Sequence, residues 1–110
     1  MTVFTLMSNQ ATPGGTPTPV SVPGNPTKAE YTLSLTGPLT GYCMATVLAS
    51  ANGQVFLPIF VMKIEAGGPN TITEGLREPG GPGAVAYIQY DAILNNIAPG
   101  GQTATLTMNV

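Results

Sequence analysis

The stretch that decides the fold class is Gln102-Thr-Ala-Thr-Leu-Thr-Met-Asn-Val110. Its side chains alternate between apolar and polar, which is the period of a β-strand with one face in a core and the other in water. The alternation predicts that Ala104, Leu106, Met108 and Val110 face the core. Threonine, a good strand former with a polar tip, fills most of the opposite face.

Two further stretches upstream have the composition of strands. Glu30–Thr36 alternates in the same way and predicts Tyr31, Leu33 and Leu35 on the core side. Tyr42–Ala51 is almost continuously apolar, which predicts a strand covered on both faces.

A hairpin signal follows the second of these stretches. Asn52-Gly53 predicts a two-residue type I′ turn, because both residue types tolerate a positive φ. The return strand is expected from Gln54 to Glu65. Pro58 lacks a backbone N–H, so it should mark an edge position or a bulge.

The rest of the chain also favours strands joined by Gly/Pro turns. We expect a short strand at Asn70–Glu74, a long loop at Glu74–Gly83 and another strand at Ala84–Tyr90. Asp91–Ala98 either continues that strand or forms one or two helical turns. Altogether the sequence predicts an all-β domain, an antiparallel β-sandwich or small barrel of about six strands.

The first 28 residues differ in composition from residues 29–110. Met1–Met7 is β-prone, whereas Ser8–Thr27 holds five prolines among Thr, Ser and Gly and is expected to be extended. The sequence therefore predicts an extended Pro/Gly/Thr-rich N-terminal arm over residues 1–28 and a β-sandwich body over residues 29–110. On this division, deleting Met1–Thr27 should leave the body folded.

The composition excludes several function classes. The 110 residues include only 3 basic and 5 acidic side chains, 7% in total, where an ordinary domain has about 25%. So few cations give no footprint for a nucleic-acid backbone. No segment is apolar and long enough to span a membrane, and the start does not resemble a secretory signal.

Few residues offer chemistry. There is no His, and the single Cys43 lies mid-strand without a neighbouring cation, as a small buried side chain would. The acids Glu65, Glu74, Glu78 and Asp91 show no spacing that singles out a catalytic pair or a metal site. We therefore expect no enzyme activity, no catalytic, cofactor-binding or metal-binding residue, and no cofactor.

The shortage of charge points instead to association. An uncharged alternating strand is an aggregation hazard unless it is paired or covered, and interface cores are depleted in charge. With its Pro/Gly/Thr arm, Thr/Ala/Gly-rich strands and sparse charge, the sequence resembles the small β-sandwich structural proteins of tailed bacteriophage virions, in particular capsid decoration or cement proteins. The resemblance covers the whole chain and rests on composition, without a signature motif.

The resemblance implies a non-enzymatic structural protein of the virion, assembled in the reducing host cytoplasm, that binds and stabilises capsid subunits. Its partners would be further copies of itself, the major capsid protein or other virion subunits, without nucleic acid or membrane. The arm would order on binding and add its strand to a neighbour's sheet. The expected partner-binding residues are Val3, Phe4, Leu6, Met7, Pro17, Pro19 and Pro23.

The alternative function is a receptor- or carbohydrate-binding β-sandwich module of a phage tail, tail fibre or adhesin. It requires exposed aromatic side chains on loops, and the sequence has no Trp, three Phe and four Tyr.

Overall fold

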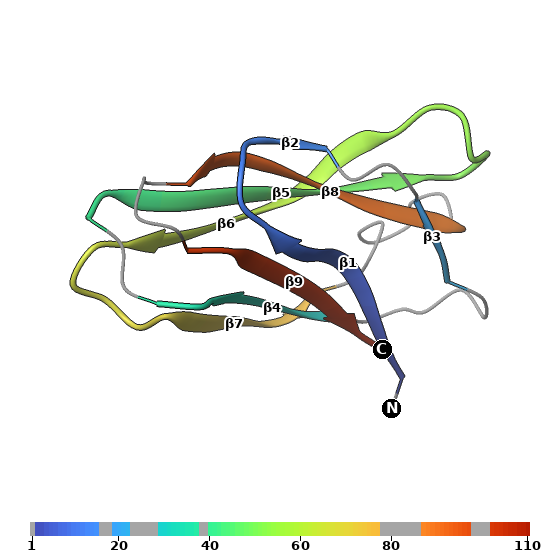
Figure 1. The fold of residues 1–110 in the computed structure, drawn as a ribbon. Coiled ribbons are helices and arrows are strands. Elements are labelled where there is room, and N and C mark those ends of the chain that lie inside the picture. Colours follow the sequence, from blue (N-terminus) through green and yellow to red (C-terminus); the bar gives the residue numbers. More distant parts are fainter. Residues whose placement is uncertain (1, 16–18, 23–28, 38–39, 78–86, 98–101) are drawn as a thin grey trace.

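The computed structural model describes residues 2–15, 19–22, 29–37, 40–77, 87–97 and 102–110, and over these residues the regular structure is entirely β (Figure 1). The strands are β1 (Val3–Gln10), β2 (Gly14–Gly15), β3 (Val20–Ser21), β4 (Ala29–Leu35), β5 (Tyr42–Ser50), β6 (Leu57–Glu65), β7 (Thr71–Arg77), β8 (Gln89–Ile97) and β9 (Ala104–Asn109). The predicted all-β class is confirmed.

The strands form two antiparallel sheets that lie one above the other (Figure 1). Sheet A has the order β1-β9-β4-β7 and sheet B the order β2-β8-β5-β6. β3 also pairs with β8, at Tyr90 and Gln89, while β2 pairs further along at Leu94 and Ile93. Since β5 occupies the other side of β8, the short strands β2 and β3 together form one edge of sheet B.

The pairing is nested. If β2 and β3 count as one interrupted strand, the first strand pairs with the last (β1–β9), the second with the second last (β2/β3–β8), and so on inward through β4–β7 to the hairpin β5–β6. The remaining pairs, β9–β4 and β8–β5, join these units into two sheets. A long hairpin rolled up in this way is the jelly-roll arrangement of a two-sheet β-protein.

One apolar core lies between the two sheets and takes side chains from both. The alternation predicted for β4 and β9 is confirmed: Tyr31, Leu33 and Leu35 are buried, as are their neighbours in β9. Across the layers, the ring of Tyr31 in β4 stacks on that of Phe60 in β6, with the centroids 5.2 Å apart. The core positions of β9 are Ala104, Leu106 and Met108, and Val110 packs against the same core.

β5 is buried on one face rather than on both. Cys43, Ala45 and Val47 are fully buried, but Met44 and Thr46 between them, and Leu48 after them, keep part of their surface. The prediction of a strand covered on both faces is therefore wrong. The apolar run reflects two different environments, because β5 is a central strand whose second face forms the outer surface of sheet B.

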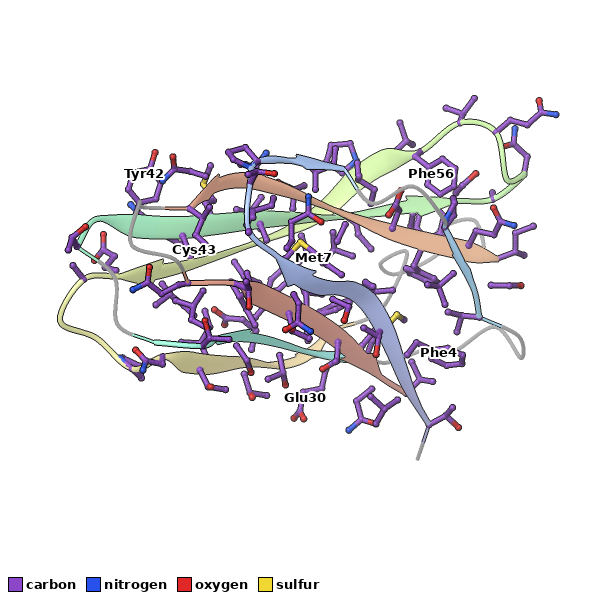
Figure 2. The ribbon with its side chains drawn as sticks, in the orientation of Figure 1. Phe4, Met7, Glu30, Tyr42, Cys43 and Phe56 are labelled. Carbon is purple, nitrogen blue, oxygen red and sulfur yellow. The ribbon has the colours of Figure 1, made fainter. Side chains whose placement is uncertain are left out.

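β1 belongs to the sandwich. It pairs with β9 from Val3 to Gln10, and Leu6 and Met7 lie in the shared core with 2% and 1% of their surface exposed (Figure 2). Val22, directly after β3, is buried in the same core. The predicted boundary between residues 28 and 29 thus does not separate an arm from a body over residues 3–10 and 19–22, because these segments bury apolar side chains that no arm in water would bury.

The pairing of β1 with β9 contains two irregularities. The register shifts between Thr5 and Met7 and again between Met7 and Gln10. In the second shift, Asn9 adopts a φ of 48°, a left-handed conformation that Asn tolerates better than most residues. The first shift explains why the adjacent Leu6 and Met7 both point into the core, which a regular strand does not allow.

The hairpin β5–β6 is confirmed, but its turn is not of type I′. Only Gly53 has a positive φ, of 78°, whereas a type I′ turn needs one at Asn52 as well. The connection is longer, and side chains organise it. Ser50 Oγ accepts hydrogen bonds from the N–H groups of Asn52 and Gly53, and Asn52 Oδ1 accepts those of Gln54 and Val55.

Other predicted boundaries shift. Pro58 does lie in an edge strand, β6, next to a register shift against β5, as its missing N–H predicts. The expected loop from Glu74 begins later, because β7 extends to Arg77, and its remainder lies outside the described residues. For Asp91–Ala98 the sequence allows a strand or helical turns, and the structure shows strand up to Ile97, as part of β8. Of the strand expected at Ala84–Tyr90, residues 84–86 lie outside the described part.

The position of β1 in the core generates a first prediction. Replacing Leu6 or Met7 by Ala should lower the free energy of unfolding by about 2–5 kcal/mol, because each substitution leaves a cavity. Val3→Ala, in the same strand but at a side chain that is 60% exposed, should change it by less than about 0.5 kcal/mol. Urea unfolding measures all three. Equal and small effects at the three positions would show that β1 is not part of the folded body.

Candidate functional site

The expected partner-binding residues of β1 lie in different environments. Val3 is exposed, Phe4 is partly buried against the core, and Leu6 and Met7 are enclosed by it. In this fold only Val3 and part of Phe4 are therefore accessible to a partner. Sequence reasoning missed this difference because it had no pairing partner for the strand.

The expected proline contacts are only partly described. Pro19 is half-buried next to β3, and Pro17 and Pro23 lie outside the described residues. Of the five expected residues that the structure describes, Leu6 and Met7 are buried, so these five do not form one accessible surface.

The described charged side chains do not converge on a site. Lys63 and Glu65, two residues apart on β6, form an ion pair with 3.2 Å between Nζ and Oε1, and both are largely exposed. Glu30 points from β4 away from sheet B (Figure 2). Within the residues that the structure describes, no three acidic, Cys or His side chains are close enough to hold a metal ion, while Glu78 lies outside that part.

The outer face of sheet A is a regular array of hydroxyl side chains. One row crosses all four strands, because Thr5 pairs with Thr107, Thr107 with Thr32, and Thr32 with Thr73. The hydroxyls of Thr32 and Thr73 are hydrogen-bonded to each other at 3.0 Å. This row is polar yet uncharged, and Glu30 lies on the same side of β4, two residues before Thr32.

The next row continues the pattern. Thr105 pairs with Ser34, and Ser34 with Thr71, whose hydroxyl donates to Ser34 Oγ at 3.4 Å. On the β1 side the backbone N–H of Asn9 donates to Thr105 Oγ1 at 3.1 Å. Sheet A thus satisfies many of its own surface hydroxyls and presents the threonine methyl groups between them.

The outer face of sheet B is apolar along its centre. The register places Val61 beside Thr46 and Thr46 beside Ile93, while Pro58 lies beside Leu48. Val61 is 52% exposed. We call the apolar members of this group, together with Met44 of β5, the apolar band; its members are Met44, Leu48, Pro58, Val61 and Ile93. They lie around Thr46, whose hydroxyl donates to Asn95 Oδ1 at 2.6 Å.

Charged groups flank the apolar band instead of interrupting it. The Lys63–Glu65 ion pair lies at one end, beside Met44 and Tyr42, and Asp91 lies beside Leu48 at the other. Three other apolar side chains near the β5–β6 loop, Val55, Leu57 and Ile88, are also exposed, but Leu57 pairs with the core-facing Ala49 and does not share the outer face. Exposed apolar side chains grouped on one face are a feature of binding sites.

Aromatic side chains offer little for sugar binding. All seven are described, and Tyr42 alone is exposed, at the end of β5 on the outer side of sheet B (Figure 2). The ammonium group of Lys63 lies over its ring, 4.8 Å from the centroid. A cation on the ring occupies a face that a sugar would otherwise stack against.

Comparison of the chain with protein-family models, with curated proteins and with solved structures gives no match. In the described part of the chain there is no helix that has the length and hydropathy to cross a membrane. The two outer faces are therefore the features from which function has to be argued.

Sequence reasoning missed the apolar band although a signal was present. In β5 the outward positions are Tyr42, Met44, Thr46 and Leu48, and the run by itself indicates burial on both sides. In β6 the apolar residues on both parities, such as Val61 outside and Met62 inside, give no alternation to assign a face. The signal is the pair of apolar faces itself, since in a two-layer sandwich each strand has one face in the core and the other on the outside.

Cys43 yields a second prediction. It is a free thiol, fully buried in β5, and burial raises the pKa of this thiol above its ordinary value. A thiol reagent should not modify Cys43 in the folded protein, and it should react with one thiol per chain after unfolding in urea. The control is Val61→Cys, half-exposed in the neighbouring strand, which should give one rapidly reacting thiol in the folded state. Rapid modification of native Cys43 would contradict its placement.

Tyr90 yields a third prediction, on alkaline stability. Burial, with a smaller contribution from Tyr87, raises its pKa to about 12, against about 10 in an unfolded chain. The folded state therefore holds this proton more tightly, so the resulting stability is complete below pH 10 and is lost as the pH rises to 12. The free energy of unfolding should fall by on the order of 2 kcal/mol over this range. In urea titrations Tyr90→Phe should flatten the decline; an unchanged slope would contradict the assignment.

Proposed function

We propose that this protein is a non-enzymatic structural protein of a virion, which binds and stabilises capsid subunits and associates through the outer face of sheet B. The observation that carries the proposal is the apolar band, in which Met44, Leu48, Pro58, Val61 and Ile93 lie around the hydrogen-bonded Thr46, with charged side chains at the two ends. The finer assignment, a capsid decoration or cement protein, rests in addition on the resemblance of the composition to that of such proteins.

The physical argument for association compares the two faces. The hydroxyls of sheet A are compatible with water and bond to one another, so this face needs no partner. The apolar band gains free energy when it leaves water, at roughly 25 cal/mol per Å² of apolar area. A polar rim around an apolar centre is the ordinary anatomy of a protein–protein interface.

The fold supports the proposal by analogy. Jelly-roll domains are common in viral capsids, and they also occur in lectins and cupins, so the strand order alone does not fix the function. The carbohydrate-binding alternative gains no support from the described aromatic side chains, since the ring of Tyr42 already faces Lys63. The capsid analogy agrees with the charge-poor composition.

A fourth prediction tests association through sheet B. Light scattering after size exclusion should show a species larger than the 11.2 kDa chain at high concentration. Val61→Lys places a charge in the apolar band and should lower the mass of this species, because burying an unpaired charge in the interface costs several kcal/mol. Thr73→Lys, on the outer face of sheet A, is the control and should leave the mass unchanged. The same loss in both variants would argue against the apolar band as the interface.

The virion role has its own test. Particles purified from the organism that carries this gene should contain the chain in many copies by mass spectrometry. An antibody against the chain should bind intact particles. Particles that lack the chain would overturn the virion assignment, whatever the oligomeric state in solution.

A further inference from the structure

β1 is held in the fold by contacts that a second copy of the chain could supply equally well. It is an edge strand of sheet A, and among the described strands it pairs there with β9 alone. Across the sandwich it packs against β8 and β3. Leu6 and Met7, which it inserts into the core, are its largest buried side chains. The groove that β1 fills is therefore built entirely by later segments of the chain.

The connection after β1 is short and crosses between the sheets. Gln10 still pairs with Ala104 in sheet A, and Gly14 already pairs with Leu94 in sheet B. Only residues 11–13 lie between, all exposed, to span layers that are about 10 Å apart in a β-sandwich. Pro13 is stiff, and Gly14 takes a φ of 146°, which L side chains rarely adopt. The chain thus turns sharply over residues 11–13, which we call the hinge and which are barely long enough to connect the two sheets.

We propose that two copies of this chain exchange β1 reciprocally, so that β1 of each copy pairs with β9 of the other and places its Leu6 and Met7 in the other copy's core. The proposal goes beyond the association through sheet B proposed above, because exchange joins two copies through β1 and β9 of sheet A and leaves the apolar band free. The pairing of Val3 with Asn109 and of Thr5 with Thr107 is then formed between copies instead of within one.

Residues 11–13 determine which of the two arrangements has the lower free energy. In a reciprocal exchange every contact of β1 is kept, so the balance is decided by the hinge and by the cost of association. Short, strained hinges favour exchange, because residues 11–13 can extend in the dimer instead of turning between sheets. A twofold dimer made in this way is closed and cannot grow into a fibre.

A fifth prediction is tested by a disulfide between the exchanged strand and its partner strand. Thr5 and Thr107 are directly paired on the outer face of sheet A, and neighbouring Cα atoms in an antiparallel pair are about 4.5–5.5 Å apart, within disulfide range. The double variant Thr5→Cys/Thr107→Cys is refolded at high concentration, oxidised, and run on a denaturing gel without reductant. We expect a covalent dimer, twice the mass of the 11.2 kDa chain. Cys43 is buried and does not compete.

The matched control is Thr32→Cys/Thr107→Cys, which joins β4 to β9, two strands that stay in one body in either arrangement. It should run as a monomer on the same gel. The reduced variants should match the parent chain in light-scattering mass and unfolding midpoint, which shows that the substitutions leave the fold intact.

The outcomes separate the two proposals. A covalent dimer for the β1–β9 pair, with a monomeric control, supports exchange. A disulfide formed only within one chain overturns exchange; if light scattering still finds a dimer, association through the apolar band stands. As a second test, inserting Gly-Ser-Gly after Ala11 relaxes the hinge and should lower the dimer fraction several-fold. An insertion that leaves the dimer fraction unchanged would count against the role of the hinge.

Discussion

The pairing of β1 with β9 is the interaction on which the rest of sheet A depends. β9 lies between β1 and β4, so it joins the strand nearest the N-terminus to the middle of the chain. The backbone of Thr2 and Val110 closes this arrangement with two hydrogen bonds of 2.9 Å. Without β1, one edge of β9 would be unpaired and the core would lose Leu6 and Met7, whose burial contributes several kcal/mol. Sheet A and the shared core are therefore one cooperative unit.

The sequence predicted well those parts of the fold that depend on a local property of the residues themselves. The alternation of Thr and apolar residues in β9 assigns each side chain to a face, and Pro58 has no N–H to give to a ladder. What sequence missed depends on partners far along the chain. Nothing local to Leu6 shows that residues around Thr107 lie beside it. In the same way, the run Tyr42–Ser50 does not show how many of its faces are covered.

For the candidate site, the sequence predicted that the protein associates but not which surface does so. The shortage of charge indicated association, yet the strand singled out for covering, β9, is paired on both sides within its own chain. The surface that lacks a cover is the outer face of sheet B, where Val61 and Leu48 stand on neighbouring strands. The composition shows that the surface carries few charges. The strand register decides which uncharged side chains are neighbours on one face, and whether that face consists of hydroxyl groups or of apolar side chains.

The nested strand order also has a consequence for synthesis on the ribosome. The hairpin β5–β6 can form soon after residue 65 emerges, and β8 can join it once residue 97 is out. Sheet A can be completed only later, because β9, which lies between β1 and β4, is synthesised after the other described strands. β1 therefore waits through the synthesis of residues 11–103 with its apolar side chains unpaired. Neighbouring ribosomes on one messenger hold several such strands close together, and each of them can pair with the β9 of any finished copy.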